Sequence, residues 1–167
     1  MSGRADYPLH RRVLGCEAAA AARARWGSWL LAQAFPEGCP QHPSYTQAHG
    51  GVAGACATIL KAAFDGATPW LTLTRSLKQS ANDGLSLEDY ASSDGGAVTV
   101  NGEIEKLCSN IALARNFAGV HWWSDYVAGL LLGEAMALTI LADQRHTYGE
   151  EFSGFTITRF DGTTITV

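Results

Sequence analysis

The sequence predicts a mainly α protein, a bundle of about four helices with long loops and a β-hairpin at the C-terminal end. Four segments repeat apolar residues at helical spacing, whereas the last segment alternates apolar and polar residues around Asp161-Gly162. With 167 residues, of which 47% are hydrophobic, the chain can form a single domain around one core.

The N-terminal region predicts an arm followed by a first helix. Residues 1–15 are polar and irregular, so we expect them to be extended. Residues 17–33 are rich in alanine, which has the highest helix propensity, and they form the first predicted helix. Arg23 and Arg25 within it are expected to face solvent.

A loop and a second helix come next. Prolines and glycines between residues 36 and 43 prevent regular structure and predict a rigid, turning connection. Residues 46–64 are small and apolar, which predicts a closely packed helix that stops at Asp65-Gly66.

Residues 67–100 are the least regular part of the chain. Residues 70–74 and 97–100 have β-type composition, with Ser, Asn, Asp and Gly between them. We therefore expect a long loop that contains a short hairpin. Such a loop either covers a pocket or is a surface excursion without chemistry.

Two helices and the hairpin complete the chain. Residues 102–118 have a helical period that places Arg115 near the C-terminal end, and residues 124–145 form the most hydrophobic helix. Gly129 and Gly133 on one face predict close contact with a neighbouring helix. Residues 155–167 form the hairpin, which either caps the bundle or pairs with another subunit.

The charge distribution bounds the function. The net charge is −4 and only 12 Lys and Arg residues are present, which argues against nucleic acid and anionic membranes as partners. Any bound anion must therefore be held by a few local cations, and Arg115 lies in an apolar neighbourhood.

We expect a soluble, cytoplasmic chain without a signal peptide or membrane span. The apolar run 127–141 carries Glu134 and looks too short to cross a bilayer. The four cysteines lack metal-ligand spacing, which favours free thiols in a reducing compartment, and we expect Cys56 and Cys108 to lie on core faces. The four cysteines of the chain are Cys16, Cys39, Cys56 and Cys108.

One short stretch combines a guanidinium, an imidazole and a carboxylate. Arg115 ends a helix, His121 follows past a glycine, and Asp125 lies in the first turn of the next helix. Arg and a helix start suit a tetrahedral anion, and Asp125 can orient the ring of His121. A buried Arg–Asp pair beside a core histidine is the alternative interpretation of these three residues alone.

The wider pattern around this stretch is more specific. The order Arg115-Asn116, Gly119, His121 and Ser124-Asp125 resembles the last signature of the vanadium-dependent haloperoxidase and phosphatidic acid phosphatase type 2 superfamily. The stretch His42-Pro-Ser-Tyr-Thr-Gln-Ala-His49 is similar to the signature before it. From about residue 7 to residue 167 the chain resembles the C-terminal part of algal and cyanobacterial bromoperoxidases.

The resemblance implies oxidation of a halide, bromide first, by hydrogen peroxide at a vanadate held by one histidine. In that family the protein supplies cations that withdraw charge from the peroxide. By position, His121 corresponds to the vanadium ligand and Arg115 to a clamp on the vanadate oxygens. We expect Asp125 to lie on the side of His121 away from the anion and to orient its ring.

The second signature supplies the remaining candidates. His49 matches the family's acid–base histidine, and His42 matches a histidine near the halide side of the pocket. Gln47 and Ala48 replace a serine and a glycine whose hydroxyl and amide grip the anion in the family. The long glutamine would extend into the space that the anion occupies, so this part of the pocket departs from the family pattern.

The family's first signature, a Lys followed by Arg-Pro, has no counterpart in this sequence. The surroundings of Arg11 and Arg12 resemble the segment after that signature. Because the chain offers one firm cation, we expect a partner chain that carries the first signature, or a homo-oligomer, to complete the site.

Two other functions remain open. Phosphate is a close analogue of vanadate, so the same residues suit an acid phosphatase in which His121 is the nucleophile and His49 protonates the leaving group. A catalytically silent homologue that serves as a binding or assembly module is the third interpretation.

Overall fold

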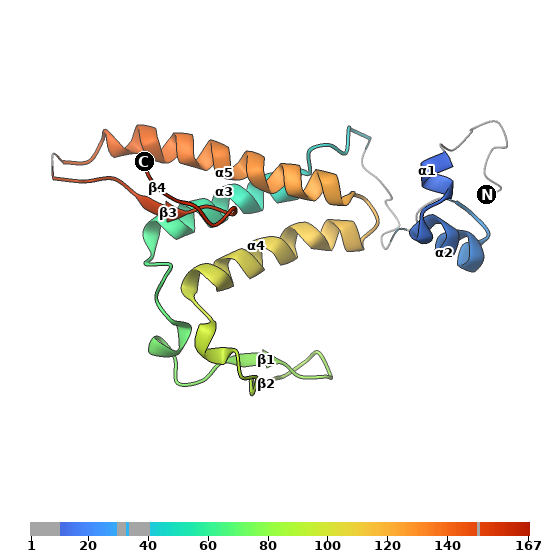
Figure 1. Ribbon diagram of the computed structural model, residues 1–167, viewed down its shortest axis with the longest axis horizontal. Helices are drawn as coiled ribbons and strands as arrows, with labels where there is room; N and C mark the ends of the chain where they lie inside the picture. The colour runs from blue at the N-terminus through green and yellow to red at the C-terminus, as the bar shows by residue number, and fades with distance from the viewer. Residues whose placement is uncertain (1–10, 30–32, 34–40, 150) are drawn as a thin grey trace.

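The computed structural model describes residues 11–29, 33, 41–149 and 151–167 (Figure 1). The fold is mainly α, as predicted, with short turns of 3-10 helix and two small antiparallel strand pairs. The helices are α1 (Arg11–Leu14), α2 (Glu17–Trp26), α3 (Ala48–Ala63), α4 (Val100–Phe117) and α5 (Trp123–Arg145). The strands are β1 (Lys78–Ser80), β2 (Leu87–Asp89), β3 (Thr156–Thr158) and β4 (Thr164–Thr166).

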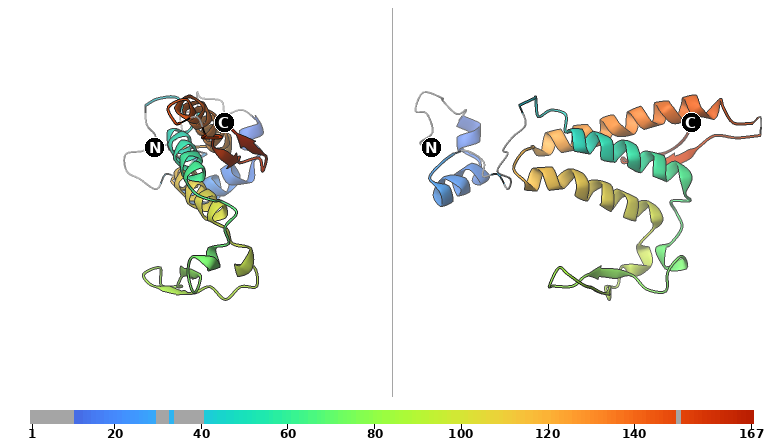
Figure 2. Two further views of the ribbon diagram at one scale, coloured as in Figure 1. Left: turned by 90° about the vertical axis from the view of Figure 1, so that its left-hand side faces the viewer. Right: turned by 180° about the vertical axis from the view of Figure 1, so that it is seen from behind.

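Helix α3 is the centre of the bundle. It lies between α4 and α5 in the views of Figures 1 and 2, and it packs closely on α5 and less extensively on α4. Helices α4 and α5 touch each other little. Helices α3 and α5 run in the same direction, and α4, which lies between them in the sequence, runs in the opposite direction. The N-terminal ends of α3 and α5 therefore lie near the C-terminal end of α4.

The close approach of α3 and α5 depends on glycine. A Cβ atom added to Gly129 would lie 2.5 Å from the Gln47 carbonyl oxygen, and one added to Gly133 would overlap with Gly51. Neither position has space for a side chain, so the backbones are in direct contact. The predicted role of Gly129 and Gly133 in tight packing is confirmed.

Helix α4 begins at Val100, two residues before the predicted start at residue 102. Thr99 is the N-cap, and its hydroxyl accepts a hydrogen bond from the Gly102 amide at 3.2 Å. Cys108 in the middle of α4 is buried against Ala53 and Ala57 of α3. Small side chains therefore form the centre of the contact between α3 and α4.

The C-terminal hairpin caps the bundle locally. Its strands pair with Ile157 opposite Ile165, and Gly162 in the turn has φ of 82°. Ile157 is 1% exposed because β3 lies on α3. The hairpin prediction is confirmed, and the local cap is the arrangement that the structure shows.

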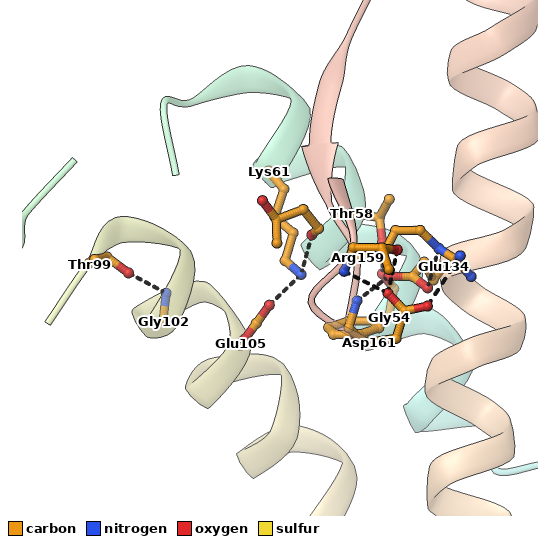
Figure 3. Close-up of polar contacts among 12 residues, drawn as sticks. Gly54, Thr58, Lys61, Thr99, Gly102, Glu105, Glu134, Arg159 and Asp161 are labelled. Carbon is orange, nitrogen blue, oxygen red and sulfur yellow. Dashed lines mark hydrogen bonds and ion pairs between the residues drawn. The ribbon is translucent and has the colours of Figure 1, made fainter. Parts of the chain in front are cut away.

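A buried polar cluster attaches the hairpin to α3 and α4 (Figure 3). Lys61 is 3% exposed, and its Nζ donates to Glu105 Oε1 at 2.6 Å and to the Thr158 carbonyl at 3.0 Å. The same ammonium lies 4.2 Å from the centre of the Phe160 ring. These contacts satisfy a lysine that would be costly to bury alone.

Glu134 extends this cluster to α5. Its side chain is 1% exposed, and Oε1 accepts from the Phe160 amide at 2.7 Å. Oε2 lies 3.4 Å from Arg159 Nε. The carboxylate in the middle of the apolar helix is therefore paired with the hairpin.

Helix α5 is 23 residues long. Among the described residues it is the one helix long and apolar enough to cross a membrane. From the sequence the apolar run looked too short for a membrane span, and the length of the helix corrects that prediction. Core helices of water-soluble proteins pass the same test, and 44% of its most apolar window is buried in the bundle. The paired Glu134 also favours a core helix.

The region before residue 41 departs from the predictions. Arg11–Leu14 forms a helical turn where an extended arm was expected, and residues 1–10 lie outside the described residues. The next helix ends at Trp26, not at residue 33. Gly27 adopts the left-handed conformation with φ of 68°, and its amide donates to the Arg23 carbonyl, so the helix is capped early. Arg23 and Arg25 are exposed, as expected.

The irregular region between α3 and α4 contains a hairpin, but its predicted strands are misplaced. Residues 70–74 and 97–100 were the predicted strands, whereas Trp70–Thr72 and Gly95–Ala97 form 3-10 turns. Pro69 precedes the first turn and accepts hydrogen bonds from Thr72 at 2.7 and 3.0 Å. These local bonds compete with a strand, and the hairpin forms in the polar segment between the two turns.

Candidate functional site

The core of the candidate site is an imidazole and a carboxylate at the start of α5. His121 is 7% exposed and Asp125 is 3% exposed. His121 Nδ1 lies 3.2 Å from Asp125 Oδ2. Because an ionised carboxylate can only accept, Nδ1 carries a proton and Nε2 is the nitrogen available to a ligand.

Asp125 is held in place by several donors. Its Oδ2 also accepts from the Trp122 amide at 3.1 Å, and its Oδ1 accepts from Ser124 Oγ at 3.3 Å. Burial raises the pKa of the Asp125 carboxyl, but the hydrogen bonds from Trp122, His121, Ser44 and Ser124 outweigh it. The net pKa lies below its ordinary value, so Asp125 is a carboxylate at neutral pH.

The loop before α3 reaches the same place. The Gln47 amide donates to the Asp125 carbonyl at 3.0 Å, and the Gln47 side chain donates through Nε2 to Asn116 Oδ1 at 2.9 Å. Gln47 has no exposed surface, and its Oε1 has no hydrogen-bond partner among the described residues. One residue thus links the starts of α3 and α5 with the end of α4.

Arg115 supplies the cation of this region. It lies in the last turn of α4, directly before Asn116, and its carbonyl accepts from the Val120 amide at 3.2 Å. Its Nε is buried and makes no hydrogen bond within the described part of the chain. An unsatisfied guanidinium donor at a buried position is unusual and suits a ligand that supplies an acceptor.

The remaining predicted residues are nearby in sequence but not bonded to this core. Ala48 and His49 are exposed and begin α3, and His42 is exposed with Nδ1 2.9 Å from the Pro43 carbonyl. Over the described residues, no hydrogen bond joins His42 or His49 to His121.

Two residues of the site were missed in the sequence. Ser44 bonds to Asp125, and Asn116 accepts from Gln47. Both lie inside the two signatures, between residues that were singled out, so their position was a usable signal. Neither partner could be named from the sequence, since each bond joins segments that are about 70 to 80 residues apart.

A groove lies beside this site, between α4 and α5. Its volume is about 370 Å³, within the range of small-molecule pockets. Tyr126 on its wall exchanges a hydrogen bond with Ser109 at 3.0 Å and stacks at a tilt on Trp123, with ring centroids 4.8 Å apart. It is lined by Glu105, Ser109, Trp123, Tyr126, Val127, Leu130, Leu131, Phe160 and Asp161.

The ends of α3, α4 and α5 bring together groups of several chemical types. In the described part of the chain, no three His, Cys, Asp or Glu side chains are grouped to hold a metal ion. The start of α3 has no side-chain cap, so the amides of its first turn remain as donors. An imidazole, a guanidinium and free backbone amides are the kinds of group that bind tetrahedral anions in proteins.

Comparison with known proteins points to one group. No protein-family model matches the chain. Vanadium-dependent bromoperoxidases from Corallina pilulifera and Corallina officinalis are each 47% identical over 140 residues, which is 84% of this chain and 22% of each relative. The vanadium-dependent bromoperoxidase from Ascophyllum nodosum is 37% identical over 147 residues, or 26% of its length.

The chain therefore spans about a quarter or less of the relatives that it matches. Identity of 47% across most of the chain is far above the level that chance similarity reaches, and a match over 140 of the 167 residues must span the positions of both signatures. The chain is a homologue of the vanadium-dependent bromoperoxidases, matched over a limited part of their length.

Proposed function

We propose that this chain is a haloperoxidase component that binds vanadate and oxidises bromide with hydrogen peroxide once a partner completes its site. The relatives named vanadium-dependent bromoperoxidase support this proposal. The observation that carries it is a buried Arg115 Nε without a hydrogen-bond partner among the described residues, six positions before His121, whose Nδ1 is fixed by Asp125.

The residues present fit vanadate in their donor types. His121 would hold the anion through Nε2, while Asp125 keeps the proton on Nδ1 and fixes the ring. Arg115 would neutralise charge on the oxygens, and the amides at the start of α3 would donate to them. Bound vanadate supplies an electrophilic vanadium(V) centre that activates peroxide toward attack by halide.

The exposed histidines would act at the mouth of the site. His49 in the first turn of α3 is accessible to solvent and is suited to take and return the proton of hydrogen peroxide. We assign His42 to the halide side from its place in the second signature. We expect Gln47 to narrow the site. Its Oε1 has no partner among the described residues, and a flip of the amide would place the donor Nε2 at that position.

A partner is part of the proposal because charge compensation within the chain is incomplete. Vanadate carries at least one negative charge, and each charge-assisted hydrogen bond is worth about 1.5–3 kcal/mol, so missing clamps weaken binding by powers of ten. The bundle also exposes apolar side chains that a partner would cover. They include Val52, Leu107, Ile111, Leu132, Met136 and Ile140, which are 44–66% exposed.

The occupant we propose for these faces is a polypeptide that carries a lysine and an Arg-Pro pair. A second copy of this chain is the competing outcome. Co-purification of the natively expressed chain, followed by sedimentation, distinguishes the two occupants. A heterocomplex supports the proposal, whereas a stable monomer that shows full bromide oxidation opposes it. We place the complex outside the bilayer, with α5 as a core helix, and the cytoplasmic location stays a prediction.

The test of the site is vanadate titration by calorimetry. Arg115→Ala and His121→Ala should each weaken binding by at least about tenfold, because each removes one strong contact. Arg145→Ala and His146→Ala are matched controls at the other end of α5, roughly 30 Å away at 1.5 Å per residue. Binding that is insensitive to both site substitutions would reject the assignment.

Activity assays separate the candidate functions. Bromide-dependent consumption of hydrogen peroxide that requires His121 supports a haloperoxidase. Turnover of p-nitrophenyl phosphate that requires His121, without bromide oxidation, would support a phosphatase. Neither activity in the completed complex, with an intact fold, would identify a catalytically silent module.

A further inference from the structure

Two cysteines, one on α3 and one on α4, line a common cavity. Cys56 on α3 is exposed, and Cys108 on α4 is 3% exposed. Both line the same small cavity, of about 50 Å³, with Ala53, Ala57 and Ile104 among the other walls. The predicted free state of the thiols is confirmed for the described cysteines, but Cys56 is exposed and not on a core face.

The register of the two antiparallel helices supports this pairing. Near one end, Lys61 Nζ bonds to Glu105 Oε1 at 2.6 Å. Near the other end, Gln47 Nε2 bonds to Asn116 Oδ1 at 2.9 Å. Interpolation between these two pairs places the two cysteines at the same level along the helices.

The contact between α3 and α4 beside the cysteines is made of small side chains. Alanines occupy the neighbouring positions of α3, and Ala112 of α4 is fully buried one turn after Cys108. A disulfide requires Cα atoms about 4.4–6.8 Å apart, a separation that helices reach only where their contact is made of small side chains. The adjoining cavity leaves space for the sulfur atoms to move.

We propose that Cys56 and Cys108 form a peroxide-responsive dithiol that closes to a disulfide between α3 and α4. The oxidant is hydrogen peroxide, the co-substrate of the proposed function, although the reaction needs no vanadate. The pair is thus a modification site that is separate from the site at His121.

The reaction balances in two steps. The Cys56 thiolate attacks one peroxide oxygen, the O–O bond breaks, and the released hydroxide takes up a proton as water. The Cys108 sulfur then attacks the sulfenic sulfur of Cys56, the S–O bond breaks, and a second water leaves with the Cys108 proton. Two thiols and one hydrogen peroxide give one disulfide and two waters.

The environments of the two thiols set the order of these steps. Cys56 is the sulfur that peroxide reaches from solvent. Burial raises the pKa of the Cys108 thiol to about 11, so Cys108 stays protonated and resists direct oxidation. Cys108 therefore acts second, when the sulfenic acid is already beside it.

Closure would fix the two helices that carry candidate site residues. Helix α3 begins next to His49, and α4 ends with Arg115 in its last turn. A covalent link between these helices closes the loop through residues 67–99, which removes many conformations of the unfolded chain. We expect the oxidised chain to melt roughly 5–15 °C higher than the reduced chain.

The test uses the full reduced chain with stoichiometric hydrogen peroxide and neither vanadate nor bromide. Intact mass should fall by about 2 Da, the loss of two hydrogens, and chymotryptic peptides should show the Cys56–Cys108 link. Cleavage after Tyr45 separates Cys39 from Cys56, so the two are distinguished. Cys16→Ser is the control and should leave the link unchanged.

Each variant has a defined result. In Cys108→Ser the oxidation should stop at a Cys56 sulfenic acid that dimedone traps, and in Cys56→Ser no bond to Cys108 should form. A different linked pair, or oxidation of Cys56 beyond sulfenic acid in the unsubstituted chain without a link, would overturn the proposal. The same link in His121→Ala keeps this result independent of the proposed haloperoxidase.

Discussion

Replacing Asp125 with asparagine tests how the carboxylate organises the candidate site. Asp125→Asn keeps the size of the side chain but removes its charge and one acceptor oxygen. In the structure the carboxylate accepts from the Trp122 amide at 3.1 Å, from His121 Nδ1 at 3.2 Å, and from Ser44 and Ser124. An asparagine retains one acceptor and directs its NH₂ group at some of these donors.

The magnitude follows from burial. Asp125 is 3% exposed, so water does not replace the lost bonds. A buried donor left without a partner costs about 1–3 kcal/mol, and hydrogen bonds to a charged group are the stronger ones. We therefore expect a loss of about 2–4 kcal/mol in the free energy of unfolding. His121 should also change tautomer, with its proton on Nε2 and not on Nδ1, so vanadate affinity should fall at least tenfold.

Two measurements check this prediction. Urea unfolding, followed by tryptophan fluorescence, gives the free energy of unfolding, and nitrogen chemical shifts of the histidine rings give the tautomer. Asp83→Asn is a matched control. Asp83 accepts from Leu85 and Ser86 in an exposed loop, where water can replace these bonds, so its effect should be smaller. If the free energy of unfolding of Asp125→Asn lies within about 0.5 kcal/mol of that of the unsubstituted chain, and Nδ1 of His121 is still protonated, the reasoning is refuted.

Three further predictions concern acid, the helix contact and the buried lysine. The pKa of Asp125 in the folded state lies below the unfolded value of about 3.9, so its ionised form stabilises the fold above that pH. This stabilisation is lost as the pH falls through the folded pKa. In Asp125→Asn the free energy of unfolding should therefore change less with pH over this acid range. Gly129→Ala should cost about 1–3 kcal/mol in urea unfolding, since its Cβ would lie 2.5 Å from the Gln47 carbonyl, and an unchanged midpoint would contradict that contact. Lys61→Met should cost about 1–3 kcal/mol and speed hydrogen exchange in the hairpin, because the Thr158 carbonyl loses its buried donor. Slow exchange retained at the hairpin in this variant would show that Lys61 does not hold it.

Local sequence patterns determined most of the helices and the hairpin. Helices α3, α4 and α5 begin and end within two residues of the predicted bounds, since their apolar periods, the Thr99 cap and the Asp161-Gly162 turn act over a few residues. The signatures around His121 and His49 were also readable, because order and spacing along the chain identify them without a structure. The comparisons with bromoperoxidases agree with that identification.

Features that join distant segments were decided only by the tertiary structure. The bonds from Ser44 to Asp125 and from Gln47 to Asn116, and the burial of Lys61 against the hairpin, depend on which helices lie side by side. Periodicity identifies the apolar face of a helix but not its neighbour. The misplaced strands between α3 and α4 have a related cause, since β propensity gave way to local turn bonds beside Pro69. The orientation of His121 also depends on the tertiary structure, because the carboxylate of Asp125 that holds its ring is bonded by groups from two segments far apart in the sequence.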